Sequence, residues 1–594
     1  MGARRRGAVT RTARSRRAAA RQRASRRLAL AVVAAVAAGV GYLLAGQGSP
    51  AARLALAYAR AWAAGRYQAA YQLLAPADRR QLSEQRFAQS CEAALRTATA
   101  YRAHVGKTAV AGKGRTYLVK AAVESRLFGV LEERFALPVV FEAGKPFIAY
   151  SGSVLFPGVP VGATLRRETE LPPRAAILAR EGTPLAEGER PPALGEGPRF
   201  SPLGAPAAAV AGSVAPLADL PQQRRAELEA EGVPPEGMVG VSGLELYFDR
   251  RLRGQPGGRL VAGKKVLATA QPKSGEALHT TISPAVQKAA VEGLGNRLGG
   301  VVALNPKTGE VLAVAGLGAD VLQPPGSTFK IITASAALEA HLVGLETSFP
   351  YRTATVLEGY KLENAGGESC GGTLIEAFAV SCNSVFVPLG VEIGAKRLVA
   401  MAEAYGFNHP LPFPGALTST IPPANEIKGE VELGSSAIGQ GKVLASPLQM
   451  ALAAATVANG GIEPTPTIEP QPHPQGHRVI KPQTAAAVAT LMRAVVTVGI
   501  GGAAAIPGVE VAGKTGTAEL GSNPCGGAPE GGGGEGKGEG CAAAERQNTD
   551  AWFAAFAPLH HPQIAVGVLV VRDGYGGETA APLARKVIEA ALGL

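Results

Sequence analysis

A run of 19 residues without a charge, LALAVVAAVAAGVGYLLAG at 28–46, constrains this chain more than any other sequence feature. As a helix it would span about 28 Å, close to the thickness of a hydrocarbon core. Residues 1–27 contain eleven Arg and no Asp or Glu, and such flanks stay cytoplasmic. We therefore expect a cytoplasmic tail at 1–27, one transmembrane anchor at 28–46 and an extracytoplasmic remainder. A cleaved signal peptide is the alternative for 28–46, although the run exceeds a usual signal-peptide core.

Most of the net charge of +13 comes from this tail. Removing its eleven Arg from the 60 basic residues leaves 49 against 47 acidic residues, a net charge of +2. The tail lacks interleaved aromatic residues and adjoins the predicted membrane span, so we expect no nucleic-acid partner. The length of 594 residues predicts several domains, and the 46% hydrophobic content is enough for large cores.

Five cysteines in an oxidising compartment can form disulfides. Cys370 with Cys382, and Cys525 with Cys541, are close in sequence, and we pair them on this proximity alone, leaving Cys91 over. The eight His are scattered, with no cluster of Cys or carboxylates around them. We therefore expect no metal site.

Hydrophobic periodicity divides the remainder into three parts. Residues 51–104 show helical spacing and the following segment a period near two, which predicts a small α+β domain at 51–155. Residues 160–275 are rich in Pro, Gly and Ala and predict a spacer or pedestal. From 276 to 594, strands, a helical middle and returning strands predict one mixed α/β domain. The expected fold class is multidomain α+β.

Three short motifs occur in order within the last part: Ser327-Thr-Phe-Lys330, Ser381-Cys-Asn383 and Lys514-Thr515-Gly516. Each motif is weak alone. Residues 307–309 are also Lys-Thr-Gly, and there a plain hairpin turn between two predicted strands is the better interpretation. The order of the three motifs and their surroundings therefore carry the argument.

The first motif is suited to nucleophilic catalysis. Pro324, Pro325 and Gly326 precede Ser327 and place it at or near a helix start, beside free N–H groups. The three-residue spacing puts Lys330 on the same helical face, within reach of the serine oxygen. A lysine acts as a base only when burial or another cation lowers its pKa, and Lys514 is a candidate for that cation.

The other two motifs supply groups that such a serine needs. Ser381 can relay protons to a leaving amine, and Asn383 can hold Lys330 and a substrate carbonyl. Lys514 and Thr515, on a predicted strand with glycines on both sides, suit a carboxylate. The backbone N–H groups of Ser327 and Thr517 are candidates for an oxyanion hole. Singly, these residues also fit a helix cap, a solvated charge and turn residues, but the ordered set favours an acyl-transfer site.

The three motifs resemble those of the serine penicillin-recognising enzymes, and their surroundings resemble the transpeptidase domain of class B penicillin-binding proteins. The segments that carry this resemblance are Gly326-Ser-Thr-Phe-Lys330, Ile438-Gly-Gln-Gly441, 446–460, Lys514-Thr-Gly-Thr517 and Trp552-Phe553. Residues 174–180 and 240–254 are similar to the family's pedestal, or dimerisation-like, motifs, with Ala179 where Asp is usual. Residues 51–155 are similar to the nuclear-transport-factor-like extension of some members.

The resemblance implies a peptidoglycan D,D-transpeptidase in which Ser327 attacks the carbonyl between the terminal D-alanines of a stem peptide. Lys330 would be the base and Ser381 the proton shuttle, while Lys514 with residues 515–517 (Thr515, Gly516 and Thr517) would bind the terminal carboxylate. β-Lactams would acylate the same serine, and no dissociable cofactor is implied. We expect an enzyme of the bacterial cell membrane whose partners are stem peptides, β-lactams and other cell-wall synthesis proteins.

Alternatives from other classes are weighed by what else they require. A D,D-carboxypeptidase would use the same motifs, because the choice between water and an amine depends on the acceptor site. A β-lactamase with a Glu-activated water needs E-x-x-L-N between the second and third motifs, and no E-x-x-x-N occurs from Asn383 to Lys514. A bifunctional glycosyltransferase would need a long helical domain, which 51–275 does not show. A β-lactam receptor would need further spans, whereas a division scaffold can coexist with catalysis.

Overall fold

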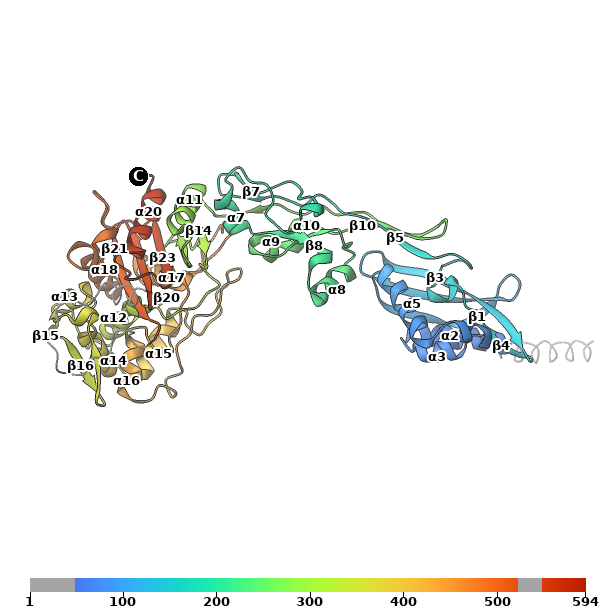
Figure 1. Cartoon of the computed structure of the whole chain (residues 1–594), viewed down its shortest axis with the longest axis horizontal. Helices are drawn as coiled ribbons and strands as arrows, with labels where there is room; N and C mark the ends of the chain where they lie inside the picture. Colours follow the sequence, from blue (N-terminus) through green and yellow to red (C-terminus); the bar gives the residue numbers. More distant parts are fainter. Residues whose placement is uncertain (1–48, 522–546) are drawn as a thin grey trace, which may run out of the picture. The chain divides into compact units, whose positions relative to one another are not determined.

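The computed structural model describes residues 49–521 and 547–594. The predicted tail at 1–27, the predicted anchor at 28–46 and both Cys525 and Cys541 lie outside these residues. No helix within the described ranges is long and apolar enough to cross a membrane. The chain divides into two compact units (Figure 1). Unit 1 extends to Leu171 and adds Pro221–Pro234 and Pro256–Pro272, and unit 2 comprises Pro172–Leu220, Pro235–Gln255 and Lys273–Leu594.

The first part of unit 1 consists of helices packed on one face of a four-stranded antiparallel sheet. In chain order the elements are α2 (Pro50–Ala63), α3 (Tyr67–Gln72), α4 (Pro76–Gln81), α5 (Glu84–Thr97), β1 (Ala100–Ala111), β2 (Thr116–Ser125), β3 (Gly129–Glu142) and β4 (Lys145–Ile148). Side chains of strand β2 alternate between the face that packs on the helices and the opposite face. Val119, Ala121 and Val123 are buried in the core with the helices, whereas Lys120 is exposed.

The helical part of unit 1 ends earlier than residue 104, where the sequence predicts its end. Thr99 has a φ of 49°, in the left-handed region, and strand β1 begins at the next residue. The Thr99 hydroxyl lies 2.8 Å from that of Ser125, which closes this corner of the sheet. The chain therefore turns from helix to strand at Thr99, although the sequence predicts helix up to residue 104.

The predicted pedestal at 160–275 is shared between the two units. Strand β5 (Leu165–Glu170) pairs with β10 (Gly257–Ala262), which also pairs with β11 (Lys265–Ala270), and all three strands belong to unit 1. The helix α8 (Gln222–Ala230) belongs to the same unit. Periodicity within a short window cannot reveal that β5 has its partner so far along the chain.

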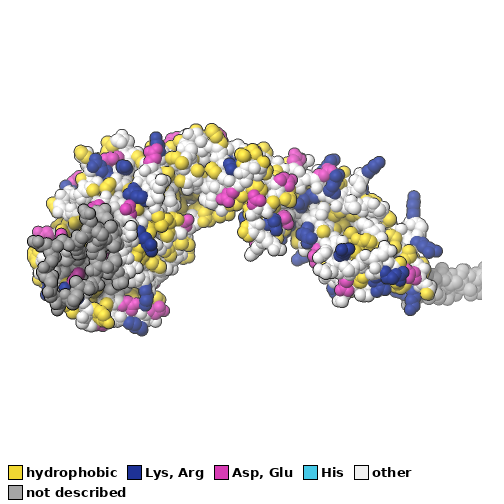
Figure 2. Space-filling model, in the orientation of Figure 1, with side chains coloured by type: hydrophobic (Ala, Val, Ile, Leu, Met, Phe, Trp, Pro, Cys, Tyr) yellow, Lys and Arg dark blue, Asp and Glu magenta, His cyan; other side chains and the backbone are white. Residues whose placement is uncertain are grey.

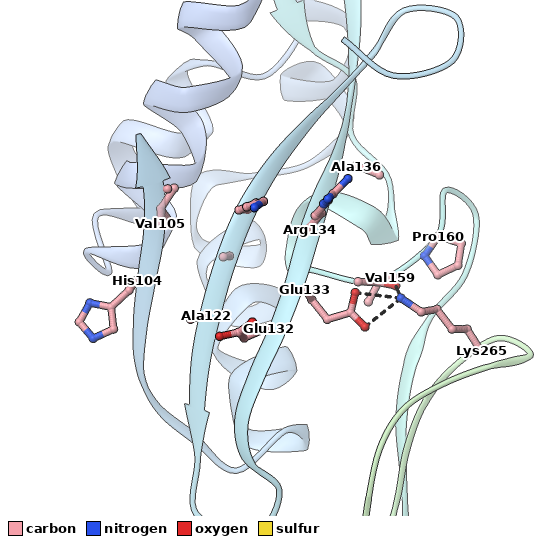
Figure 3. A pocket seen from close by; sticks show the side chains of 14 residues that line it. His104, Val105, Ala122, Glu132, Glu133, Arg134, Ala136, Val159, Pro160 and Lys265 are labelled. Atoms are coloured by element: carbon pink, nitrogen blue, oxygen red, sulfur yellow. Dashed lines mark hydrogen bonds and ion pairs between the residues drawn. The ribbon is translucent and has the colours of Figure 1, made fainter. Parts of the chain in front are cut away.

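A pocket of about 850 Å³ lies within unit 1, lined by residues of β1, β2 and β3, of the segment 158–160, and by Lys265. Figure 3 shows Lys265 facing Glu133, and the Lys265 Nζ donates to both carboxylate oxygens at 2.9 Å. All three predicted motifs are in unit 2. This pocket is therefore not part of the candidate active site.

The first part of unit 2 holds a buried cluster of charges. Arg174 donates from Nε to Glu245 at 2.7 Å and from Nη1 to Asp249 at 2.9 Å, and Arg199 donates from Nε to Glu245 at 2.6 Å. Glu245 lies in α9 (Gly243–Tyr247) and Asp249 begins α10 (Asp249–Arg253). The two predicted pedestal motifs are thus joined by ion pairs, and Ala179 has no charge to contribute.

We expect Glu245→Gln to lower the free energy of unfolding of unit 2 by about 3–5 kcal/mol, because the buried guanidinium of Arg199 loses its carboxylate partner and that of Arg174 keeps only Asp249. The Glu245 side chain is 0% exposed. Urea denaturation followed by circular dichroism measures the change. The matched control is Glu589→Gln, whose ion pair with Arg585 is partly exposed and is worth less than about 1 kcal/mol. Equal losses in the two variants would contradict a structural role for the cluster.

The rest of unit 2 is built on a five-stranded antiparallel sheet with the order β14-β13-β23-β22-β21. The strands are β13 (Gly299–Leu304), β14 (Val311–Gly316), β21 (Ala512–Glu519), β22 (Thr549–Ala557) and β23 (Ile564–Val570). Two hydrophobic cores contain residues of this sheet. One core also contains α11 (Pro284–Leu294) and α20 (Ala580–Leu592), and the other contains α17 (Pro447–Ala458). The further helices are α12 (Lys330–Glu339), α13 (Leu374–Ala379), α14 (Asn383–Ile393), α15 (Ala395–Ala404), α16 (Gly429–Ala437) and α18 (Pro482–Thr497). Strand β21, which carries the third motif, is at an edge of the sheet.

Candidate active site

Ser327 lies in a single 3-10 turn, η3 (Gly326–Phe329), which leads directly into α12. The turn is packed closely against β21, because a Cβ on Gly326 would lie 2.7 Å from the carbonyl oxygen of Thr517. Gly326 N also donates to Gly439 O at 2.9 Å. Both glycines have a positive φ, 51° and 70°, which a side chain would strain. The half-buried Ser327 is thus fixed beside the third motif.

Lys330 connects the first motif to the second. Its Nζ donates to the carbonyl oxygen of Ser381 and to Oδ1 of Asn383, both at 2.7 Å, and lies 3.3 Å from Ser381 Oγ. Asn383 is itself oriented, because its Nδ2 donates to Glu363 O at 3.0 Å. Lys330 is fully buried. Burial, and secondarily the neighbouring Lys514, holds the pKa of Lys330 well below its ordinary value.

Ser381 lies between the two buried lysines. Its hydroxyl accepts a hydrogen bond from Lys514 Nζ at 2.8 Å and lies 3.3 Å from Lys330 Nζ. The residue has a φ of 62°, which is unusual for a non-glycine residue and is typical of functional sites. This conformation sits in the connection between α13 and α14 and holds the hydroxyl where both lysines reach it.

Lys514 joins the third motif to the second. Its Nζ donates to Thr515 O at 2.9 Å and lies 3.3 Å from Thr515 Oγ1, in addition to its bond with Ser381. Burial lowers the pKa of Lys514 to about 7. The described structure therefore brings five of the predicted residues into one hydrogen-bonded group: Lys330, Ser381, Asn383, Lys514 and Thr515.

Two contacts predicted from the sequence stay predictions: the contact of Lys330 with the Ser327 oxygen, and the oxyanion hole. Lys330 lies one turn after Ser327, but the hydrogen bonds described above direct its Nζ to the second motif. The turn η3 lies against β21, which is an edge strand. Alternate N–H groups of an edge strand point away from the neighbouring strand, here β22. An oxyanion hole made by the N–H groups of Ser327 and Thr517 agrees with this arrangement. Thr517 Oγ1 accepts from Gly576 N at 3.5 Å.

Sequence reasoning missed two aromatic rings beneath the lysines. Lys330 Nζ lies 5.5 Å from the ring centroid of Phe386, and Lys514 Nζ lies 5.5 Å from that of Phe378. These rings desolvate the amines while offering their negative faces to any positive charge. The available signal was position, because each Phe lies three residues from a polar residue of the second motif.

Cys370 and Cys382 form a disulfide in this structure, with a Cα–Cα distance of 5.8 Å. The bond ties strand β18 (Cys370–Thr373) to the residue between Ser381 and Asn383. Among the described cysteines, Cys91 is a free and buried thiol in unit 1. No group of three or more His, Cys, Asp or Glu in the described ranges could hold a metal ion.

Two segments of the chain match known families. Residues 299–589 match the penicillin binding protein transpeptidase domain, and residues 196–280 match the penicillin-binding protein dimerisation domain. The first segment contains all three motifs, and the second contains Glu245 of the buried charge cluster. Neither segment reaches 51–155.

Curated relatives and solved structures agree with these matches. The peptidoglycan D,D-transpeptidase PbpA of Mycolicibacterium smegmatis is 36% identical over 425 residues, which are 59% of this chain and 79% of the relative. The PbpA of Mycobacterium tuberculosis is 34% identical over 413 residues, 58% and 77% of the two chains. A ceftriaxone acyl-enzyme complex of M. tuberculosis penicillin-binding protein A aligns with a TM-score of 0.55 and 28% identity, covering 71% of this chain and 98% of that one. A D,D-transpeptidase domain from Eggerthella lenta gives 0.56 and 26%, with the same coverage.

Proposed function

The chain belongs to the class B penicillin-binding proteins, which are serine D,D-transpeptidases of peptidoglycan, and from this membership we propose the role of each residue in its active site. Ser327 Oγ attacks the carbonyl between the two terminal D-alanines of a stem peptide while Lys330 accepts its proton. The C–N bond then breaks, the leaving D-alanine amine takes up a proton, and an acyl-serine ester remains. The amine of a neighbouring stem attacks this ester, which forms the cross-link and returns the proton to Ser327.

The hydrogen bonds of Lys330 support its role as the base. A neutral amine has two N–H donors and one lone pair, and the acceptors on Ser381 and Asn383 at 2.7 Å use both donors. The lone pair is then available to a proton from Ser327. Burial, and secondarily Lys514, lowers the pKa of Lys330 and so favours the neutral amine, which is the form that a base needs.

The position of Ser381 supports a proton shuttle. A hydroxyl accepts one proton while it gives up another, and Ser381 Oγ lies 3.3 Å from Lys330 Nζ and 2.8 Å from Lys514 Nζ. A proton taken from Ser327 by Lys330 can therefore pass through Ser381 to the leaving amine. Lys514, Thr515 and Thr517 on the edge strand bind the terminal carboxylate of the substrate, with Lys514 in its cationic form.

The opposite protonation states of the two lysines predict a bell-shaped pH profile for the second-order rate constant of acylation by a penicillin. The rate rises as Lys330 loses its proton. It falls above a pH of about 7, where Lys514 becomes neutral and no longer attracts a carboxylate. Acylation measured across the neutral range, with the free acid and with its methyl ester, checks this assignment. The ester should lose the alkaline limb alone, and an unchanged alkaline limb would contradict the role of Lys514.

Transfer to an amine is tested directly by product analysis. The full-length enzyme is incubated with a stem pentapeptide and an acceptor stem, and mass spectrometry separates the cross-linked dimer from the hydrolysed tetrapeptide. A transpeptidase yields dimer that increases with acceptor concentration. Tetrapeptide alone, at every acceptor concentration, would make the protein a carboxypeptidase. A β-lactam acylates the same Ser327, so prior treatment with penicillin removes either product.

We also propose a location and a membrane anchor for the enzyme. The uncharged run at 28–46 would anchor it in the bacterial cell membrane, with 1–27 in the cytoplasm and the catalytic part outside. Residues 51–155 would form a nuclear-transport-factor-like domain, an assignment that the packing of α2, α3 and α5 on one face of a four-stranded sheet supports. Other cell-wall synthesis proteins would bind outside the active site.

A further inference from the structure

We propose that one end of unit 1 docks on an anionic lipid surface. This end, named the basic end, consists of exposed residues from the first turn of α2, the β1–β2 hairpin and the β3–β4 turn: Arg53, Lys107, Val110, Lys113, Arg115, Phe141 and Lys145. The inference deepens the proposed membrane location and rests on it, because the anchor would bring this end close to the bilayer.

The three segments meet at the end of the sheet where the described chain begins. Ser49, the residue before α2, lies with its hydroxyl 3.2 Å from that of Tyr117, at the start of β2. The β1–β2 hairpin turns just before that point. Val139 N donates to Arg115 O at 2.9 Å, so the last residues of β3 lie beside the same hairpin. The turn into β4 follows, and it therefore shares this end.

The charge of unit 1 fits an anionic partner. Its described residues contain 22 Lys or Arg and 12 Asp or Glu, a net charge of +10, whereas the whole chain after residue 27 has a net charge of only +2. Within 106–116 and 140–146 there are four basic residues and one acidic residue, the half-buried Glu142. Figure 2 shows Lys and Arg side chains gathered at this end of unit 1.

Apolar side chains project among these charges. Val110 is 62% exposed at the β1–β2 hairpin and Phe141 is 49% exposed beside the β3–β4 turn. The Arg115 guanidinium lies 5.7 Å from the centroid of the Phe141 ring. Cations that flank exposed apolar tips are typical of segments that insert shallowly between lipid head groups. A surface that served only for solubility would not need the two apolar tips.

The length of the connecting chain places the basic end within reach of head groups. Three residues separate the predicted anchor at 28–46 from α2, and covalent geometry limits three residues to about 11 Å. Charges act over a Debye length of about 10 Å at moderate salt. The proposed anchor would therefore keep the first turn of α2, which belongs to the basic end, in the region where an anionic membrane attracts Lys and Arg.

Tryptophan quenching tests the docking with a matched pair of variants. Val110→Trp reports on the basic end, and Val130→Trp, at the opposite end of the same sheet and also 62% exposed, is the control. The native Trp62 and Trp552 are buried and provide a constant background. Each full-length variant is reconstituted into vesicles of brominated phosphatidylcholine and phosphatidylglycerol in equal amounts. We expect strong quenching at residue 110 and little at residue 130.

A charge variant tests whether anionic lipid is the partner. Lys107, Lys113, Arg115 and Lys145 are all replaced by Gln in the Val110→Trp chain, which should lose most of the quenching. The Val110→Trp chain with its basic residues intact should show the same loss of quenching on vesicles of brominated phosphatidylcholine alone, because these vesicles carry no anionic lipid. Penicillin acylation should not change in any of these variants, because the altered residues are not in the catalytic group.

The outcomes separate docking from anchoring. Resistance of the full chain to alkaline carbonate extraction tests the membrane anchor alone. If carbonate extracts the chain, quenching of residue 110 by added brominated vesicles still tests whether the basic end binds lipid. Equal signals at residues 110 and 130, or quenching that ignores both lipid charge and the Gln substitutions, overturns the proposal. Absent quenching together with a dimer that the Gln substitutions abolish would assign the basic end to a second copy, which also overturns it.

Discussion

Ser327→Ala should remove all covalent labelling by benzylpenicillin and lower the rate of cross-linking by roughly 10³–10⁶-fold. The alanine side chain has no nucleophile, and no neighbouring hydroxyl can replace it, because Ser381 is held by both lysines. Intact-mass spectrometry of the full-length protein after incubation with the drug measures the adduct. Peptide mapping then locates it on the wild type.

Folding of this variant is checked independently. Ser327 is half-buried in a turn that backbone contacts hold, including the bond from Gly326 N to Gly439 O, so the thermal midpoint should change little. A persistent adduct in Ser327→Ala would identify another nucleophile and overturn the assignment. Drug hydrolysis without any lasting adduct on the wild type would instead indicate efficient deacylation by water.

Lys330→Met should lower the acylation rate constant by roughly 10²–10⁴-fold, the usual contribution of a positioned base. Methionine matches the length of the lysine stem and fits the same buried space beside Phe386, so the fold is expected to survive. Stopped-flow acylation with a chromogenic cephalosporin measures the loss. The residual rate should also lose the acidic limb of the pH profile, which a purely structural effect would not change.

The control for this variant comes from the second Lys-Thr-Gly sequence of the chain. Lys307→Gln alters an exposed residue between β13 and β14 and should leave the acylation rate within about twofold. A comparable loss in both variants would mean that overall charge, and not the base, controls the rate. An unaffected rate in Lys330→Met would assign the base to another group, with Lys514 as the first to test.

Local sequence signals were sufficient for the parts of the site that depend on near neighbours. The proline pair before Gly326 predicted that Ser327 starts a helix, and the structure has a 3-10 turn there that leads into α12. The short separation of Cys370 and Cys382 predicted the bond that the structure contains. Both features are determined by residues within about twelve positions of each other.

The remaining features depend on contacts between distant segments. The position of Ser381 between two lysines requires that α12, the α13–α14 connection and the edge strand β21 converge, and no periodicity encodes this convergence. The extent of unit 1 depends on such a contact too, since β5 finds its partner in β10. The positive φ of Ser381 was also hidden, because serine shows no preference for that conformation.

The two glycines that hold the nucleophile's turn limit how drug resistance can evolve in this enzyme. A Cβ on Gly439 would collide with the carbonyl oxygen of Gly326, and a Cβ on Gly326 would collide with that of Thr517. We therefore expect any substitution at either position to shift the turn that carries Ser327 and to lower cross-linking and acylation by β-lactams together. We therefore expect variants that resist β-lactams while still building the wall to keep both glycines.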